Sequence, residues 1–206
     1  MATRRFIVVG AGGHAKVVIS SITAGGDSVI GVLDDDPTQL GRTVLGMKVI
    51  GAVDAALVPA DAVVVLAIGS NRARQTIAQR LKVRYASVVH PSAVVHPSVT
   101  IGEGTVVFAG AVIQPDTVVG AHTIVNTSAS IDHDNRIGAF AHIAPGTHLS
   151  GTVTVGDGVL IGIGSAVIPG MTIGEWAIVG AGSAVVANVP QGATVAGRPA
   201  KPLVKE

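Results

Sequence analysis

The most regular feature of the chain is a hydrophobic position that recurs every six residues. The series starts at Val89 and ends at Val185 without a gap, and every member is Val, Ile or Leu. The position four residues further on is small or β-branched in nearly every repeat. Six-residue repeats are typical of a parallel β-helix, in which each short strand places one aliphatic side chain in a narrow interior. The pattern therefore predicts a β-helix over this part of the chain.

The first 86 residues follow a different pattern, in which short apolar strands alternate with helices. Strands are expected over residues 6–9, 29–33 and 62–68, and helices over residues 14–24 and 72–81. This alternation predicts a small parallel α/β sheet. The fold class is therefore mixed, with a Rossmann-like α/β domain over residues 1–86 and a β-helix with a C-terminal tail over residues 87–206.

Composition agrees with a thin β-helix and excludes several classes of protein. Hydrophobic residues make up 48% of the chain but aromatic residues only 2%, as expected of an interior too narrow for large rings. No apolar run approaches the roughly 18 residues of a membrane-spanning helix, so we expect no membrane partner. The net charge of +1 is spread along the chain, which argues against nucleic acid. The chain has no cysteine, which excludes disulfides and fits a cytoplasmic protein.

A glycine-rich turn follows the first predicted strand and opens the first predicted helix. Its pattern, Gly10-x-Gly12-x-x-Ala15, lets a phosphate approach backbone amides at the positive end of a helix. Asp34, after the next strand, is placed to accept hydrogen bonds from a ribose or a base. A dinucleotide needs two such halves and this segment supplies one, so the turn favours a single nucleotide diphosphate such as a nucleotide-activated sugar. The alternative is a turn that serves only to pack the strand against the helix.

One repeat, residues 131–136, is unusually polar. It has Asn135 where other repeats have a small residue, and it places His133 between two aspartates. A departure from a consistent pattern is expected at a functional site. A histidine beside a carboxylate is a natural general base near neutral pH, because the carboxylate stabilises the imidazolium. Neighbouring side chains on a straight strand point in opposite directions, so Asp134 reaches His133 only if the chain bends there.

Other histidines also lie in the repeat region. Four of them are expected to be solvated residues at outward positions of the β-helix: His90, His96, His122 and His148. A zinc site would need several histidines at a suitable spacing. His133, His142 and His148 are spaced by nine and six residues, which does not match the pattern of β-helical zinc enzymes. We therefore expect no metal.

Four stretches, distributed over nearly the whole chain, carry a resemblance to one known family. They are Val9-Gly10-Ala11-Gly12-Gly13-His14-Ala15-Lys16-Val17-Val18, Ala67-Ile68-Gly69-Ser70-Asn71, Asn126-Thr127-Ser128 through Asp132-His133-Asp134, and Gly197-Arg198-Pro199-Ala200-Lys201. The chain resembles the bacterial sugar acyltransferases of the left-handed β-helix class, in the branch that joins a Rossmann-like domain to hexapeptide repeats. That branch includes sialic acid O-acetyltransferases and N-acetyltransferases that act on nucleotide-linked 4-amino sugars.

The resemblance implies a homotrimer with active sites between adjacent β-helices, acetyl-CoA as the donor substrate, and no metal. By the same resemblance, His133 is the general base and Asp134 orients it. His142 is expected beside the thioester, and Gly151 is expected to offer its backbone amide to the oxyanion. Gly151 also follows His133 by 18 residues, which is three repeats, so we expect it to stack one coil away from the histidine.

The resemblance also implies residues that bind the two substrates. Asn126 is expected to line the site. Ile163 and Ala181 correspond to positions along the pantetheine groove, and Lys201 to a position near the CoA phosphates. In the N-terminal domain, the residues expected to hold the nucleotide-sugar are Gly12, Gly13, Asp34, Asp35 and Asn71.

The unbroken six-residue register indicates that no loop is inserted into the β-helix to hold an acceptor. Acceptor recognition then falls to the N-terminal domain, which favours a nucleotide-bearing acceptor. The leading hypothesis is an acetyltransferase that moves acetyl from acetyl-CoA to the amine of a nucleotide-activated amino sugar of the 4-amino-4,6-dideoxy type. The alternatives are O-acetylation of a sialic acid or related sugar hydroxyl, and a non-catalytic sugar-nucleotide-binding accessory protein.

Overall fold

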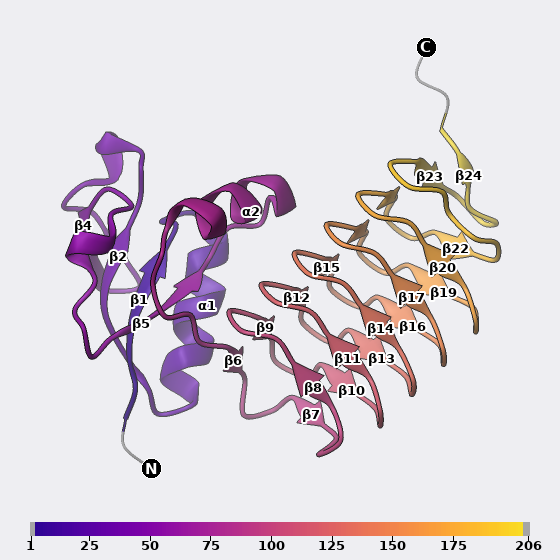
Figure 1. The fold of residues 1–206 in the computed structure, drawn as a ribbon, viewed down its shortest axis with the longest axis horizontal. Helices are drawn as coiled ribbons and strands as arrows, with labels where there is room; N and C mark the ends of the chain where they lie inside the picture. Colours follow the sequence, from indigo (N-terminus) through magenta and orange to yellow (C-terminus); the bar gives the residue numbers. More distant parts are fainter. Residues whose placement is uncertain (1–2, 204–206) are drawn as a thin grey trace.

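The computed structural model describes residues 3–203 and has two parts, an α/β sheet with its helices and a long β-helix (Figure 1). The sheet of the first part has the strand order β3-β4-β2-β1-β5. All pairs in it are parallel except β3 with β4. Its elements are β1 (Arg5–Val9), α1 (Gly13–Ala24), β2 (Ser28–Leu33), the 3-10 turn η1 (Pro37–Gln39), β3 (Thr43–Val44), β4 (Met47–Gly51), the 3-10 turn η2 (Ala55–Leu57), β5 (Val63–Leu66) and α2 (Asn71–Arg80).

The strands and helices predicted for this part are confirmed as β1, α1, β2, β5 and α2. The β3–β4 hairpin is an addition that the sequence pattern does not reveal. Only Val44 and Val49 of these two strands are buried, so the hairpin lacks the apolar run by which a strand is recognised.

The two helices cover opposite faces of the sheet because alternate residues of a strand point to opposite sides. Phe6 and Val8 of β1 pack in one buried cluster that includes residues of α1. Ile7 and Val9 pack in a second cluster that includes residues of α2. The carboxyl ends of β1, β2 and β5 are left open between the helices, which is where a parallel sheet binds ligands.

From β6 onward the chain winds through three parallel sheets, which we call the first, second and third faces of the β-helix. The first face contains β6 (Val88–Val89), β9 (Val106–Val107), β12 (Ile124–Val125), β15 (His142–Ile143), β18 (Leu160–Ile161), β21 (Ile178–Val179), β23 (Thr194–Ala196) and β24 (Lys201–Pro202). The second face contains β7 (Val94–Val95), β10 (Val112–Ile113), β13 (Ser130–Ile131), β16 (His148–Leu149), β19 (Ala166–Val167) and β22 (Ala184–Val185). The third face contains β8 (Thr100–Ile101), β11 (Val118–Val119), β14 (Arg136–Ile137), β17 (Thr154–Val155) and β20 (Thr172–Ile173).

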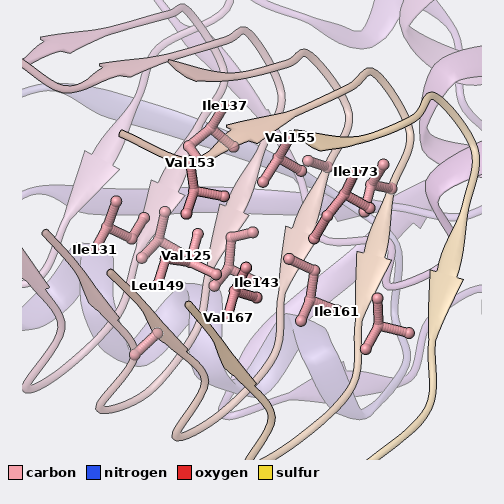
Figure 2. Packing of buried hydrophobic residues seen from close by; sticks show 14 of the residues in the cluster. Val125, Ile131, Ile137, Ile143, Leu149, Val153, Val155, Ile161, Val167 and Ile173 are labelled. Carbon is pink, nitrogen blue, oxygen red and sulfur yellow. The ribbon is translucent and has the colours of Figure 1, made fainter. Parts of the chain in front are cut away.

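The six-residue series forms the interior of this β-helix, as predicted. Strands that pair lie one coil apart, as Ile131 with Leu149 and Val125 with Ile143. Figure 2 shows these aliphatic side chains stacked in rows along the axis. Val125, Ile131 and Ile143 are each 0% exposed. The series ends at β23, which pairs with β21 in a register of 16 residues instead of 18, as Ile178 with Thr194. The last strand, β24, then folds back antiparallel to β23.

The edges between faces are tight turns with left-handed backbone. The turn between the third and first faces has positive φ at Gly104, His122, Phe140, Gly158 and Trp176, which are successive positions one coil apart. The other edges repeat the same conformation, including φ +57 at Asp134. These turns direct side chains outward from the edges, where several of the predicted site residues lie.

The α/β part docks on the outer side of the first face. Outward residues of its first three strands, Val88, Val106 and Ile124, are buried in the same cluster as residues of α1. The next outward residues are His142 and Leu160, which are partly buried, and then Ile178, which is 42% exposed. His142 therefore lies at the border between the covered and the open parts of this face. Within residues 3–203, no helix is long and apolar enough to cross a membrane.

Candidate active site

His133 and Asp134 form a bonded pair at the edge between the second and third faces. Nδ1 of His133 lies 2.7 Å from Oδ2 of Asp134. The positive φ of Asp134 is the bend that lets adjacent side chains meet, because it breaks the alternation of a straight strand. The bond from Asp134 raises the pKa of His133 above its ordinary value, and the charge of Asp132 adds to the effect. Within residues 3–203 the other ring nitrogen, Nε2, has no hydrogen-bond partner.

Gly151 lies directly beneath the His133 ring, one coil away as expected from its spacing. A Cβ added to Gly151 would lie 2.6 Å from both Cε1 and Nε2 of the ring. The carbonyl of His133 accepts from the amide of Thr152 at 2.9 Å, which holds the two coils together here. Within residues 3–203 the Gly151 amide donates no hydrogen bond, so it remains available beside the ring.

Asn135 explains why this repeat departs from the pattern. Its side chain is 0% exposed, and Nδ2 donates to the carbonyls of Asp132, His133 and Ser150. It therefore braces the turn that carries His133 against the next coil. The polar character of the repeat thus has a structural cause in part, since the buried Asn135 side chain supports the turn that carries His133.

His142 and Asn126 form a second cluster, on the first face and at its edge with the second face. Nδ2 of Asn126 lies 3.0 Å from Nε2 of His142, and Oδ1 of Asn126 accepts from the amide of Thr127 at 2.8 Å. Because the amide nitrogen donates, Nε2 of His142 carries the lone pair. Burial lowers the pKa of His142 to about 4, with contributions from the charges of Arg74 and His14.

His14 joins this cluster from the glycine-rich turn. Its ring centroid lies 6.4 Å from that of His142 and 5.4 Å, edge-on, from that of Phe108. Burial lowers the pKa of His14 to about 4, with a contribution from Arg74. Its Nε2 atom is buried without a hydrogen-bond partner in the described residues. The motif around Gly12 contained His14, but only the docking of the two parts shows that it meets His142.

One chain does not bring the two clusters together. His133 and Gly151 lie at the edge between the second and third faces, whereas Asn126 lies at the edge between the first and second faces. Ile163 and Ala181 are exposed at the same edge as Asn126, two and three coils further along. The two groups of predicted residues therefore flank the second face on opposite edges.

The remaining residue of the predicted CoA site, Lys201, lies at the C-terminal end of the β-helix. Lys201 is exposed on β24, which pairs with β23 of the first face. This strand continues the face that carries His142. The C-terminal strand therefore places the Lys201 side chain on the face whose edge carries Ile163 and Ala181.

The predicted nucleotide-sugar residues surround the carboxyl ends of β1 and β2. Gly12 and Gly13 are exposed, and a Cβ on either would meet nothing within 4 Å. Asp34 accepts from the Ala11 amide at 2.7 Å, which ties the glycine-rich turn to β2. Asp35 lies 2.6 Å from Arg80 of α2. A pocket of about 110 Å³ lies between these aspartates and α2.

Asn71 occupies a different environment from the other predicted nucleotide-sugar residues. Its Nδ2 atom donates to the carbonyls of Gly158 and Val159 at 3.1 Å, and its Oδ1 atom accepts from Arg74 at 2.8 Å. The side chain thus joins α2 to the β-helix, and its polar atoms are already engaged there.

The expectation that His122 is a solvated surface residue is wrong. It is 5% exposed, stacks on Phe140 with ring centroids 5.1 Å apart, and meets Tyr85 edge-on at 4.6 Å. The cause is the docking of the α/β part, which covers the edge that carries His122. Burial lowers its pKa to about 4. His96 and His148 are exposed as expected, and His90 is partly exposed.

A β-helix that carries a histidine–carboxylate pair beside a glycine amide with no acceptor in residues 3–203 is suited to acyl transfer. Within the described residues, no group of three His, Asp, Glu or Cys is arranged to hold a metal ion. A model of the PglD N-terminal domain matches residues 5–81. UDP-N-acetylbacillosamine N-acetyltransferase of Bacillus subtilis (strain 168) is 43% identical over 112 residues, which is 50% of this chain and 50% of that enzyme.

Solved structures match the whole chain. A histidine-to-asparagine variant of perosamine N-acetyltransferase from Caulobacter crescentus, in complex with CoA and GDP-perosamine, is 41% identical with a TM-score of 0.93, and the match covers 99% of each chain. The acetyltransferase domain of PglB from Neisseria gonorrhoeae FA1090, in complex with acetyl coenzyme A, is 40% identical with a TM-score of 0.91, covering 98% of this chain and 100% of that one. The chain therefore belongs to the family of N-acetyltransferases that join a PglD N-terminal domain to a left-handed β-helix.

Proposed function

We propose that this protein transfers acetyl from acetyl-CoA to the amine of a nucleotide-activated amino sugar of the 4-amino-4,6-dideoxy type. The observation that carries the proposal is the His133–Asp134 pair, bonded at 2.7 Å, with the unbonded Gly151 amide beneath its ring. The relatives support the substrate class, since one is a UDP-N-acetylbacillosamine N-acetyltransferase and another binds CoA and GDP-perosamine.

In this mechanism His133 removes a proton as the sugar amine attacks the thioester carbonyl. A new C–N bond forms, and the carbonyl oxygen becomes an oxyanion that the Gly151 amide stabilises by a preorganised hydrogen bond. When the intermediate collapses, the C–S bond breaks and His133 passes its proton to the departing CoA sulfur. Asp134 holds the ring by its Nδ1 atom, so that Nε2 faces the amine.

The opposite pKa shifts of the two histidines support different roles for them. Asp134 raises the pKa of His133, which makes it the stronger base. Burial lowers the pKa of His142 to about 4, so this ring stays uncharged at neutral pH. We assign His142 and Asn126 to the thioester as neutral hydrogen-bonding groups. Pairs of groups whose environments separate their pKa values are typical of acid–base sites.

A homotrimer would unite the two clusters that one chain keeps apart. They lie on the two edges that flank the second face. If three copies turn this face toward a common axis, the His133 edge of one copy meets the Asn126 edge of its neighbour. The groove between them would then hold the pantetheine beside Ile163 and Ala181, with Lys201 near the phosphates.

We place the enzyme in the cytoplasm, where acetyl-CoA is available.

We assign the nucleotide to the open edge of the α/β sheet. Gly12 and Gly13 leave room for a diphosphate at the start of α1, and Asp34 and Asp35 border the adjacent pocket. The amino sugar would extend from there toward His14 and His142. Asn71, which was expected to bind the nucleotide-sugar, is better placed to hold α2 against the β-helix.

Thiol release from acetyl-CoA tests the reaction and its rivals. We expect release with nucleotide-linked 4-amino sugars and no release with sialic acids, because the N-terminal domain recognises a nucleotide. A nucleotide-sugar that binds the native state should also raise the Tm. At a ligand concentration of a hundred times its Kd, binding increases the free energy of unfolding by about 2.7 kcal/mol. Turnover of sialic acid alone would favour the O-acetyltransferase. A raised Tm without thiol release across the panel would favour a non-catalytic binding protein.

The pH profile tests the His133–Asp134 pair. Because a general base must be uncharged, kcat/KM should fall as the pH drops through the raised pKa of His133. Asp134→Asn removes the bond that stabilises the imidazolium, so the pKa should fall and the acid limb should move to lower pH, with a lower plateau. Asp132→Asn is the matched control: Asp132 accepts from the backbone amide of His133 and acts on the ring by its charge, so this substitution should shift the limb less. An acid limb that stays in place in Asp134→Asn contradicts the assignment.

A further inference from the structure

An aromatic cluster lies on the edge between the third and first faces, outside the proposed active site. The His122 ring stacks on the Phe140 ring, with centroids 5.1 Å apart and an angle of 11° between the planes. Tyr85 meets the His122 ring edge-on at 4.6 Å. His122 and Phe140 occupy the same position in successive coils, whereas Tyr85 belongs to the segment that joins α2 to the β-helix. The cluster therefore connects the two parts of the chain.

The His122 ring is enclosed in this cluster. The residue is 5% exposed. Gly104, one coil earlier, lies against the ring, since a Cβ added to Gly104 would lie 2.3 Å from Nδ1 of His122. Nδ1 is buried and has no hydrogen-bond partner in residues 3–203. A buried polar atom without a partner costs free energy, and a buried charge without one costs far more. The cluster therefore accommodates the uncharged ring and disfavours the imidazolium.

Arg74 of α2 places a buried cation against the same two coils. Its Nε atom donates to the carbonyl of His122 at 2.8 Å, and its Nη2 atom donates to that of Phe140 at 2.8 Å. Arg74 is 1% exposed, and within the described residues it forms no ion pair with a carboxylate. Burial lowers its pKa to about 10, so it remains charged at neutral pH. A protonated His122 would therefore add a second positive charge beside a buried cation that has no carboxylate partner.

The other titratable groups around the His122 ring, among the described residues, are Tyr85, Lys82 and Glu103. The hydroxyl of Tyr85 donates to the carbonyl of Leu81 at 2.8 Å, and burial raises the pKa of Tyr85 to about 12, so this group stays uncharged. Lys82 and Glu103 line a pocket of about 400 Å³ beside the ring, and their charges have opposite signs. Within residues 3–203 the Glu103 carboxylate forms no ion pair with His122.

The first turn of α2 holds this helix along the same edge (Figure 1). Besides the bonds of Arg74, Asn71 donates to the carbonyl of Gly158 on the next coil. The guanidinium of Arg72 lies 4.4 Å from the ring centroid of Trp176, a further coil along. A helix of 10 residues is marginal in water without such packing, so release from the edge would also unfold α2.

We propose that His122 is an acid-sensitive latch between the two parts of the chain: its uncharged ring completes the interface, and its protonation releases α2 from the edge of the β-helix. Histidine suits this role because its charge changes between about pH 5 and pH 8 unless its surroundings shift it. The latch itself does not depend on the proposed function. Where that function holds, release would part the assigned nucleotide site from His142 and stop acetyl transfer.

Proton binding gives the direction of the effect. Burial lowers the pKa of His122 from its ordinary value of 6.5 to about 4, with a contribution from the charge of Arg74. Because the docked state binds this proton less tightly than the released state, docking is strongest above pH 6.5 and weakens as the pH falls toward 4. The opening constant, which is the equilibrium ratio of released to docked α2, should rise by up to about tenfold per pH unit for each such histidine. His14 and His142, at the same interface, also have pKa values lowered to about 4 and act in the same direction.

Hydrogen exchange of the α2 amides, followed by mass spectrometry from about pH 7 to pH 4, measures the opening constant even when release is rare. His122→Phe keeps a ring for stacking but cannot be protonated. At neutral pH we expect its α2 to dock at least as firmly as in the wild type, because no buried ring nitrogen is left unpaired. Toward pH 4 the wild-type opening constant should rise about a hundredfold more than that of His122→Phe, which is the linkage of one histidine with this pKa change.

His96→Gln is the matched control, since His96 is exposed and bonded to Ser98 away from the interface, and it should keep the wild-type pH dependence. If His122→Phe does not fold, the pH dependence of His122→Gln decides. The same pH dependence in the wild type and in these His122 variants overturns the latch. A parallel rise in the exchange of the β-helix strands also overturns it, because it would show acid unfolding of the whole chain rather than release of α2. No substrate enters the measurement, so the proposed function can fail while the latch stands.

Discussion

His133→Ala is expected to lower kcat by about 10²–10⁴-fold while leaving acetyl-CoA binding and assembly intact. The ring is outside the hydrophobic interior, and its side chain is 56% exposed, so its removal should leave the β-helix stable. The loss arises because the His133 ring, which lies against Gly151, is the group assigned to take the amine proton. His142, with a pKa of about 4, is too weak a base to replace it.

The measurement is steady-state thiol release, with acetyl-CoA binding followed by calorimetry. The control is His96→Ala, an exposed histidine that lies two coils away on the same edge and whose ring Nδ1 atom is bonded to Ser98. It should turn over like the wild type. Near-normal kcat in His133→Ala would remove the histidine from the mechanism, and loss of acetyl-CoA binding would mean that the ring has a structural role.

Gly151→Ala should reduce kcat by about 10²–10³-fold, which is comparable to the loss of one oxyanion donor. The backbone at Gly151 is not left-handed, so alanine itself introduces no backbone strain. The new methyl group would lie 2.6 Å from the His133 ring, far inside van der Waals contact. The His133 ring must therefore move away from the backbone amide of residue 151.

A double-mutant cycle tests that explanation. If Gly151→Ala acts mainly by displacing the ring, it should cost much less in the His133→Ala background, because coupled residues are not additive. Full additivity would show that the two positions act independently. Pro169→Ala is a control at the next coil of the same edge, where a side chain is already present, and it should have little effect on kcat.

In the α/β part, the local sequence pattern predicted some elements and missed others. The strands and helices that bury one apolar face were predicted within a few residues, because burial imposes a period of two on strands and a longer one on helices. The β3–β4 hairpin was not predicted, since only Val44 and Val49 of it are buried. Asp34 was recognised from its place after β2, but its bond to the Ala11 amide depends on how the turn closes.

The histidines also show which properties a local sequence pattern predicts and which depend on tertiary contacts. His133 was predicted to be the general base partly because its repeat departs from an otherwise regular pattern, and the structure places its ring beside Asp134 and Gly151. His122 was misassigned because an outward position of a β-helix is solvated unless another part of the chain covers it, and the docked α/β part does so. Arg74 has no sequence signal at all. An arginine in a polar helix looks like a surface residue, and only the carbonyls of two coils show otherwise.

The sequence by itself determined the β-helix, the α/β part and the edge position of His133 and Gly151. The β-helix and the two edge positions follow from a repeat in which a residue's number fixes its face, because the coils from β6 to β22 have 18 residues each. Only the tertiary structure decided which outward residues are covered, which histidines lose their charge, and which edges carry the two halves of the site. Those properties depend on contacts between segments far apart in the chain, and no local pattern encodes them.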